Sequence, residues 1–308
     1  MQYSVWVSSG HSWDEILGLC RHIESTGWDG IWIPDHFMPP EGGYGQEVEP
    51  GQDPELDPVH EGWSLVAALA GLIPRVRLGV LVSGNTYRQP AVLAKMAATI
   101  DHISNGRLLL GLGSGWQENE HRRYGIPYPT ALEFSDRLEE AAAVITALMS
   151  AGPRSTVEGV HYELIDAPLQ PKPIQNPMPL LIGGSGELRT LRTAARYATH
   201  SNMWGTPETM TRKRAILDRH CQDAGRDPAE VSLSANAFLI FVDDPEEAAS
   251  TRSDMGDRGG LVGTPDQIRH QIDAYRAAGV DEIVIAGFNY TPETFPPALA
   301  RLRSLLDR

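Results

Sequence analysis

The sequence is poor in cysteine and in long apolar runs. Two cysteines, Cys20 and Cys221, occur among 308 residues, and both fall in segments with a helical pattern, so a disulfide framework is not expected. No run approaches the roughly 18 consecutive apolar residues of a bilayer-spanning helix, so no membrane partner is predicted. The first ten residues lack the basic-then-apolar order of a signal peptide, and we expect a cytoplasmic protein.

Positive charge is also scarce. The sequence has 26 Lys and Arg against 40 Asp and Glu, a formal net charge of −14. A surface of this sign repels nucleic acid on average, and no Lys/Arg run marks a basic groove, so nucleic acid is not expected as a partner. The acidity is typical of ordinary soluble enzymes and does not indicate a cationic partner.

Motifs of two enzyme classes are missing. No G-x-S-x-G sequence occurs, which leaves serine hydrolase chemistry without its nucleophile. The ten histidines show no H-x-H or H-x-x-x-H spacing, so no metal site is predicted. A metal hydrolase stays open as an alternative, because barrels with acids or histidines at strand ends do bind metals.

What the sequence does contain is a regular alternation of apolar runs and amphipathic segments. The apolar runs predict strands, the fourth and fifth ending in glycine turns, over residues 3–9, 30–34, 76–84, 107–115, 179–186, 200–205, 231–242 and 281–288. The longer segments predict helices over residues 13–27, 61–73, 90–104, 131–150, 187–198, 207–224, 264–278 and 292–306. Ser12 and Glu15 predict a capping box at the first helix.

Eight strand–helix units in one chain fit a (β/α)8 barrel better than an open sheet. The expected fold class is therefore α/β, a TIM barrel, and because no domain boundary interrupts the rhythm we expect residues 1–308 to form a single domain. Residues 151–178 and 243–262 do not fit the rhythm and are predicted insertions. Loops of that length are usually functional or mobile.

Active sites of such barrels lie at the C-terminal ends of the strands. His36 follows the second predicted strand in the sequence I-W-I-P-D-H-F, so the topology assigns it to this face. Asp35 precedes it, and neighbours on an extended segment point in opposite directions. Asp35 is therefore not expected to orient His36 as the acid of a catalytic triad would.

Two glycine turns follow predicted strands. The first, G-L-G-S-G-W, lacks the third glycine of a dinucleotide fingerprint because Trp116 stands in its place. Its backbone still allows close approach of a ligand at Gly113, Ser114 and Gly115.

The second turn leads directly into a helix, where free N–H groups form an anion site. It consists of Gly183, Gly184, Ser185 and Gly186. Glu187 at the helix start opposes an anion, whereas Arg189 and Arg192 would offset it.

Aromatic residues recur at the strand ends. Each one singly is more often a packing residue than a ligand contact, but together on one face they favour a planar cofactor. They are Trp6, Trp116, Trp204, Phe288 and Tyr290, of which the three tryptophans are the predicted substrate-pocket residues.

Three stretches resemble one family along nearly the whole chain. They are W-D-E-I-L to M-P-P in residues 13–40, R-V-R-L-G to P-Y-P in residues 75–129, and P-L-L-I-G-G-S-G to W-G in residues 179–205. The chain resembles the bacterial luciferase-like flavin and deazaflavin superfamily, and within it the actinobacterial F420-dependent oxidoreductases. The block 75–129 is the most specific part of this resemblance.

The resemblance implies a (β/α)8 barrel that binds coenzyme F420 across the strand ends and passes a hydride between the ring and a small-molecule substrate. His36 would be the catalytic residue, in a D-H-F motif with Asp35 beside it. A non-proline cis peptide would lie at Leu81–Val82, next to Ser83, against the ring. Asn119 would touch the polar edge of the ring, and residues 183–186 would bind the cofactor phosphate. The resemblance also implies a homodimer that packs through the helices after the second and third strands.

The chain departs from the sugar-phosphate dehydrogenases of the family at two positions. An acid is replaced by Trp116, and a tryptophan four residues past the histidine is replaced by Pro40. Glucose 6-phosphate oxidation and its acid–histidine pair are therefore not expected. An FMNH2-dependent monooxygenase served by a separate flavin reductase is the alternative, and a non-catalytic flavin-binding barrel is an alternative of another class.

Overall fold

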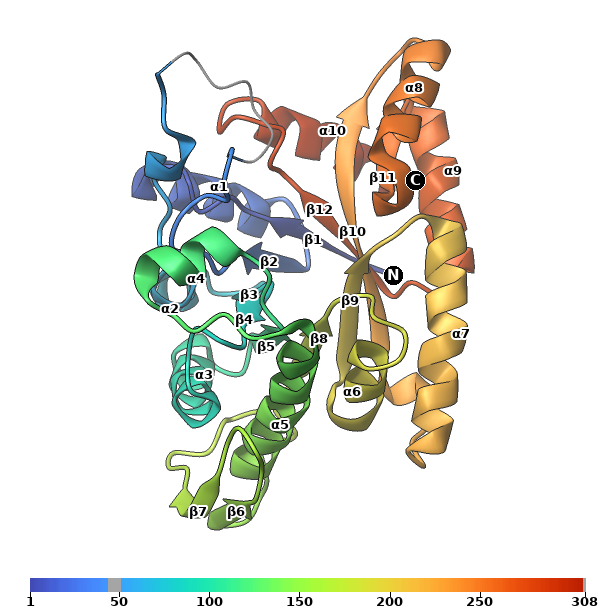
Figure 1. Ribbon diagram of the computed structural model, residues 1–308. Coiled ribbons are helices and arrows are strands. Elements are labelled where there is room, and N and C mark those ends of the chain that lie inside the picture. Colours follow the sequence, from blue (N-terminus) through green and yellow to red (C-terminus); the bar gives the residue numbers. More distant parts are fainter. Residues whose placement is uncertain (44–50, 307–308) are drawn as a thin grey trace.

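The computed structural model describes residues 1–43 and 51–306. Parallel strands close into a barrel, because β1 (Gln2–Trp6) pairs with both β2 (Gly30–Ile33) and β12 (Glu282–Ala286). Between them, in order, lie β3 (Arg77–Val80) with its continuation β4 (Ser83–Gly84), β5 (Leu108–Gly113), β8 (Leu180–Gly183), β9 (His200–Trp204) and β10 (Ser232–Phe241) (Figure 1). The predicted (β/α)8 barrel is confirmed.

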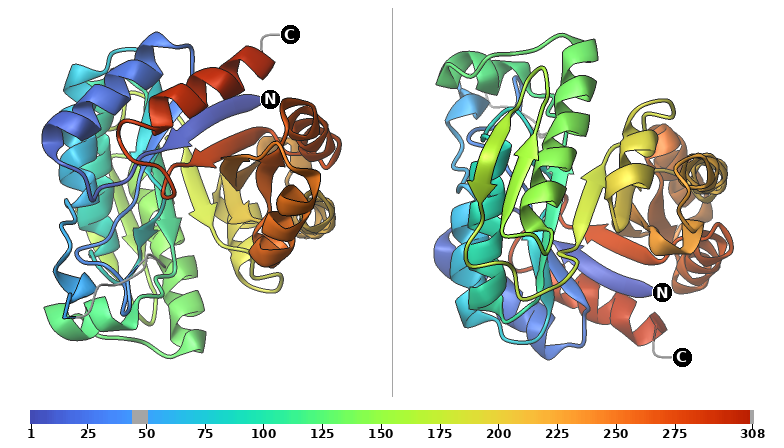
Figure 2. Two further views of the ribbon diagram at one scale, coloured as in Figure 1. Left: turned by 90° about the horizontal axis from the view of Figure 1, so that it is seen from above. Right: turned by 90° about the horizontal axis from the view of Figure 1, so that it is seen from below.

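Helices surround the strands in both views of Figure 2. Each predicted helix is present, although the one after β8 and the last one each start three residues late. They are α1 (Trp13–Ser25), α2 (Gly62–Leu72), α3 (Pro90–Ser104), α5 (Ala131–Met149), α6 (Thr190–Tyr197), α7 (Pro207–Asp223), α9 (Pro265–Ala277) and α10 (Phe295–Leu306). The predicted capping box is confirmed, since the Ser12 hydroxyl accepts the Glu15 N–H and the Glu15 carboxylate accepts the Ser12 N–H.

The two insertions contain secondary structure and are not simple loops. Residues 151–178 include an antiparallel hairpin of β6 (Arg154–Val157) and β7 (Leu164–Pro168), which lies beside α5 (Figure 1). Residues 243–262 include α8 (Pro245–Met255), a 3-10 turn η3 (Gly256–Arg258) and β11 (Gly260–Gly263), which extends the sheet beside β10. The apolar periodicity used for prediction did not reveal them, because β6 and α8 are mostly polar and β11 is only four residues long.

Three further short elements were not predicted. A helix, α4 (Glu118–Tyr124), follows the first glycine turn, and the 3-10 turns η1 (Pro54–Leu56) and η2 (Pro228–Glu230) lie in loops. The helix α4 is seven residues long and mostly polar, so it carries no apolar stripe to reveal it.

The core lies between the barrel and its helices. In α1, Ile16, Leu19, Cys20 and Ile23 are buried at the spacing of one helix face. Both cysteines are buried and free. Across the described residues, no helix combines the length and the apolarity needed to cross a bilayer.

Candidate active site

A cis peptide bond joins Leu81 and Val82 between β3 and β4, where the resemblance implied it. The Val82 side chain projects toward glycines of the two adjoining strands. A Cβ atom at Gly113 would lie 2.5 Å from Val82, and one at Gly183 would lie 2.8 Å from it. These two glycines are therefore required at least as much for the packing of Val82 as for the approach of a ligand.

Asp35 lies beneath the mouth of the barrel in a buried ion pair. Its carboxylate accepts two hydrogen bonds from Arg88, at 2.6 and 3.0 Å, and one from the Ser83 hydroxyl at 2.6 Å. Burial raises the pKa of Asp35, and the Arg88 guanidinium and the Ser83 hydroxyl oppose that shift. Asp35 has no bond to His36, which confirms that it does not act as a triad acid toward that histidine.

His36 is instead bonded to an acid that the sequence did not single out. Its Nδ1 atom lies 3.1 Å from Oε2 of Glu120, whose side chain is fully buried. Glu120 also accepts hydrogen bonds from the Phe37 N–H and the Tyr87 hydroxyl. Burial raises the pKa of Glu120, but the His36, Phe37 and Tyr87 donors outweigh it and hold that pKa below its ordinary value.

An acid–histidine pair is thus present, which corrects the expectation that the loss of an acid at Trp116 had removed it. Because an ionised carboxylate only accepts hydrogen bonds, the Nδ1 atom that faces Glu120 carries a hydrogen. The Nε2 atom has no hydrogen bond to another described residue, so it is the ring nitrogen available to a substrate.

The first turn of α4 and the residue just before it hold the loop after β2 by its backbone. The side-chain amide of Gln117 donates to the Met38 carbonyl at 2.9 Å, and that of Asn119 donates to the Pro39 carbonyl at 3.1 Å. Asn119 also donates to the Glu55 carboxylate at 2.9 Å. The buried Asn119 side chain therefore fixes the loop that carries His36, and it does not line the cavity at the barrel mouth.

That cavity, of about 370 Å³, opens between the ends of the barrel strands. Most of the predicted site residues line it, together with Asn202, Met203 and Asn236: Trp6, Leu81, Val82, Gly113, Ser114, Gly115, Trp116, Gly183, Gly184, Ser185 and Trp204. His36 stands beside it, because its ring meets Trp116 edge-on with 5.6 Å between ring centroids. Asp35, Ser83, Asn119 and Gly186 do not line the cavity.

The second glycine turn has free backbone donors. The N–H groups of Ser185 and Gly186 have no acceptor among the described residues, and Gly184 adopts φ +124°, which favours glycine. The helix α6 that follows has no side-chain cap at its start. The turn therefore fits the phosphate of a nucleotide-like cofactor.

The basic side chains near this turn are already paired. Arg189 bonds to Asp136 and Arg192 to Glu139, both on α5, so neither offsets Glu187 as predicted. Glu187 is neutralised instead by Arg212 and Lys213 of α7, at 2.8 and 2.9 Å. An anion at the turn would thus be bound by backbone N–H groups.

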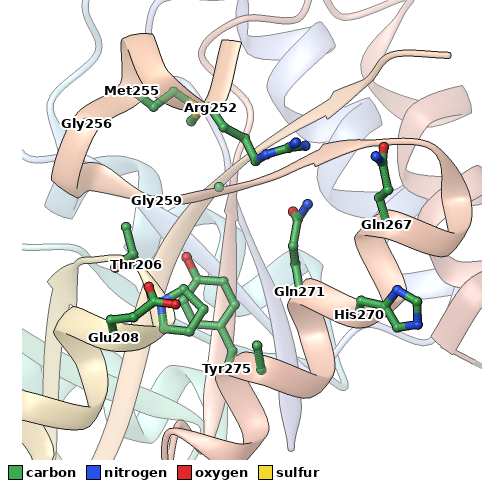
Figure 3. Close-up of a pocket in the computed structure, with 13 residues that line it drawn as sticks. Thr206, Glu208, Arg252, Met255, Gly256, Gly259, Gln267, His270, Gln271 and Tyr275 are labelled. Carbon is green, nitrogen blue, oxygen red and sulfur yellow. The ribbon is translucent and has the colours of Figure 1, made fainter. Parts of the chain in front are cut away.

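A larger cavity, of about 420 Å³, lies outside the barrel among α7, α9 and the segment from α8 to β11 (Figure 3). Its polar groups mostly support the backbone. The Gln271 amide bonds both the N–H and the carbonyl of Val262, and the Tyr275 hydroxyl donates to the Gly205 carbonyl. None of the predicted site residues lines it, so we place the candidate active site at the barrel mouth.

The described residues contain no group of three or more His, Cys, Asp or Glu side chains placed to hold a metal ion. The titratable pair of His36 and Glu120 lies beside a cavity that has glycine and tryptophan walls. This arrangement suits proton transfer next to a bound planar group.

Sequence reasoning missed Glu120, Tyr87, Arg88 and Gln117. Glu120 stands in W-Q-E-N-E, where two acids flank an asparagine. A helix prediction over this segment would have placed Glu118 and Glu120 on different faces of the helix. Asn236 was also missed, and Asn202 was placed at a strand end but given no role, although two asparagines inside strand patterns are an unusual signal.

Comparison with known proteins gives matches of three kinds. A family model described as luciferase-like monooxygenase matches residues 1–255. The F420-dependent glucose-6-phosphate dehydrogenase of Amycolatopsis mediterranei (strain U-32) is 34% identical over 189 residues, 60% of this chain and 50% of that protein. The pyrimidine monooxygenase RutA of Pseudomonas syringae pv. syringae (strain B728a) is 32% identical over 195 residues, 62% of this chain and 53% of that protein.

The chain thus spans about half the length of these two curated relatives. Among solved structures, an F420-dependent secondary alcohol dehydrogenase in complex with an F420–acetone adduct superposes with a TM-score of 0.79. The match covers 98% of both chains at 18% identity, which shows a shared fold.

Proposed function

The chain belongs to the luciferase-like monooxygenase family, a family of enzymes, and from that membership we propose that it is an F420-dependent oxidoreductase. The proposed reaction transfers a hydride between the deazaflavin and a small organic substrate. Curated relatives named as F420-dependent dehydrogenases support this cofactor.

The observation that carries the proposal is the His36–Glu120 pair beside the mouth cavity. Hydride transfer to or from a carbon that bears oxygen needs a partner for the proton on that oxygen. His36 provides it through Nε2, while Glu120 holds the ring by Nδ1 and stabilises the charged imidazolium. The pair therefore meets the requirement of a dehydrogenase or reductase.

The residues present fit the cofactor. The free N–H groups of Ser185 and Gly186 would bind its phosphate, and the backbone at Leu81–Val82 would support its ring. When bound, the deazaflavin supplies or accepts the hydride. The protein binds and orients the reactants and exchanges the proton at His36.

The test is a pair of titrations of the purified chain, one with F420 and one with FMN, followed by fluorescence. We expect F420 to bind at micromolar concentration or below and to bind more tightly than FMN. Absence of F420 binding at these concentrations would rule the proposal out.

An FMNH2-dependent monooxygenase is the second candidate. The similarity to pyrimidine monooxygenase RutA favours it, and a backbone phosphate site serves FMN as well as F420. Oxygen consumption with FMNH2 from a flavin reductase, but none with reduced F420, would make this the better assignment. A non-catalytic flavin-binding barrel would instead bind a cofactor and give no turnover with either.

We further propose that the chain forms a homodimer through α2 and α3. Three large apolar side chains are exposed there: Leu72 at 48%, Val92 at 54% and Ile103 at 48%. Light scattering after gel filtration measures the mass directly, and Val92→Lys with Ile103→Lys should convert a dimer to monomer.

A further inference from the structure

The second glycine turn is followed by an acid, although the turn fits an anion. The Glu187 carboxylate bonds to α7, where Arg212 donates to its Oε1 atom at 2.8 Å and Lys213 donates to the same atom at 2.9 Å. The hydrogen bond from Lys213 holds the pKa of Glu187 below its ordinary value, so this carboxylate is ionised at neutral pH. The negative charge beside the turn is therefore bound by α7, which packs against α6 (Figure 1).

Lys213 is the buried member of this pair of cations. It is 7% exposed, and a buried ammonium is costly unless it is hydrogen-bonded. Its Nζ atom bonds to two acceptors, the Ser185 carbonyl at 2.7 Å and the Glu187 carboxylate at 2.9 Å. Both acceptors belong to the turn or to the residue after it, so the buried charge of Lys213 is committed to this segment.

Three successive carbonyl groups of this segment each accept a hydrogen bond. The donors are, in chain order, Lys213 to Ser185, the Leu191 N–H to Gly186 at 3.0 Å, and Nε2 of His220 to Glu187 at 2.8 Å. The peptide units here are trans, since the cis bonds of the described residues lie elsewhere. In a trans unit the C=O of one residue and the N–H of the next point in opposite directions. Each N–H group of residues 186–188 therefore points away from the donor that holds the preceding carbonyl.

The N–H groups of residues 185–188 are open to a ligand. None of them has an acceptor among the described residues. Successive free N–H groups of a turn form a concave anion site. A site whose donors are already oriented pays less for ordering when it binds. The contacts that hold the carbonyls thus prepare the turn for an anion.

From these contacts we propose that Lys213 is a positioning residue for the cofactor phosphate. Its ammonium holds the Ser185 carbonyl toward α7, and the Gly186 N–H of the same peptide unit is thereby presented on the opposite side. His220 does the same for the N–H of Leu188. The inference rests on the proposed function, which places the phosphate at this turn, and it adds the helix that holds the turn in its binding conformation.

Arg212 separates positioning from simple attraction of charge. It bonds to the same Oε1 atom of Glu187 and carries the same charge as Lys213, but its side chain is 61% exposed. Among the described residues it donates to no backbone carbonyl of the turn. Removing either cation lowers the positive charge near the turn by one. If Lys213 acts by holding the Ser185 carbonyl, its loss should weaken phosphate binding and the loss of Arg212 should not.

A matched pair of ligands isolates the phosphate. The Kd is measured by fluorescence for the deazaflavin–ribitol fragment of F420 with and without its 5′-phosphate. In the parent chain the phosphorylated fragment should bind more tightly by about ten-fold or more, because its charged hydrogen bonds are the only difference.

Substitutions then locate the origin of this preference. Lys213→Met should raise the Kd of the phosphorylated fragment about ten-fold and change that of the other fragment by less than about two-fold. Arg212→Met should keep the preference within about two-fold of the parent, as expected for an exposed ion pair. A preserved preference in Lys213→Met, or an equal loss in Arg212→Met, overturns the inference.

A double variant excludes a defect of folding or of charge balance. Lys213→Met combined with Glu187→Gln removes both members of the pair, so no carboxylate is left without its counter-charge. This variant should still lack the preference for the phosphorylated fragment, and it carries the test if Lys213→Met alone lowers the melting temperature too far. Recovery of the preference would mean that Lys213 only neutralises Glu187, which overturns the inference.

The same measurement with FMN and riboflavin separates the inference from the function on which it rests. Binding of FMN without binding of F420 overturns the proposed cofactor, and Lys213→Met must then reduce the preference for FMN over riboflavin. F420 binding with an unchanged phosphate preference in Lys213→Met and in the double variant overturns the inference alone. Absence of binding by both phosphorylated cofactors overturns the two together.

Discussion

The Nδ1 atom of His36 lies 3.1 Å from Oε2 of Glu120, a fully buried carboxylate 84 residues further along the chain. The contact joins the loop after β2 to the short helix α4. It leaves Nε2 as the ring nitrogen without a hydrogen bond to another described residue, and it fixes the orientation of a histidine beside the mouth cavity.

Glu120 acts on the reaction through His36, so it is a positioning residue. Glu120→Gln should lower kcat by about 10- to 100-fold, because an amide cannot accept all three donors that now meet the carboxylate. The pH–kcat profile should shift, since the imidazolium loses its counter-charge. Glu118→Gln, an exposed acid on the same helix, is the control. An unaltered pH profile would show that Glu120 is merely structural.

His36 is predicted to exchange the proton directly. His36→Asn should lower kcat by about 10²- to 10⁴-fold while the Kd for F420 changes less than three-fold, because general acid–base catalysis contributes on that scale. His270→Asn, an exposed histidine of α9, should leave both values unchanged. Full turnover in His36→Asn would remove this histidine from the mechanism.

Gly184 is predicted to be needed for cofactor affinity. Gly184→Ala should weaken F420 binding about ten-fold, because φ +124° strains an alanine and disturbs the turn that presents the N–H groups. Gly225→Ala is a matched control, because Gly225 also has a positive φ, +71°, and nothing lies within 4 Å of the added Cβ. Both should lose about 1–3 kcal/mol of stability, and equal F420 affinities would contradict the phosphate assignment.

The Asp35–Arg88 pair is predicted to stabilise the fold. Asp35→Asn should lower the free energy of unfolding by about 3–5 kcal/mol in urea titrations, because it leaves the buried guanidinium without its main counter-charge. Asp266→Asn breaks an exposed pair with Arg269 and should cost less than about 1 kcal/mol. Similar losses of unfolding free energy in the two variants would contradict this prediction.

His200 is predicted to make stability dependent on pH. Burial, with a smaller contribution from Arg77, lowers the pKa of His200 to about 4, so the unfolded chain binds this proton first as the pH falls. The contribution of neutral His200 to the free energy of unfolding is complete above about pH 6.5. It is lost toward pH 4, at about 1.4 kcal/mol per pH unit. His200→Asn should flatten the curve of unfolding free energy in this range, and His270→Asn should not.

The expectation of a single domain over residues 1–308 remains a proposal. Limited proteolysis followed by unfolding measurements is the direct approach, and one cooperative transition is the expected result.

The sequence by itself determined the barrel and the face on which its site lies. Strand–helix alternation is a local property, because apolar periodicity, the Ser12 capping box and Pro90 at a helix start act over a few residues. Once eight such units are counted, chain topology assigns His36, Gly113 and Gly183 to the same end of the barrel. The family resemblance added the cis peptide at Leu81–Val82, which the structure confirms.

Only the tertiary structure decided which side chains meet. The acid that faces His36 is Glu120 and not its neighbour Asp35, because backbone alternation turns Asp35 toward Arg88 while α4 folds over the loop. Likewise Arg189 and Arg192 bond to α5, so the glycine turn of residues 183–186 has backbone N–H groups and not these guanidinium groups as its donors. Pairings across 50 to 84 residues depend on how helices pack around the barrel, and no local pattern encodes them.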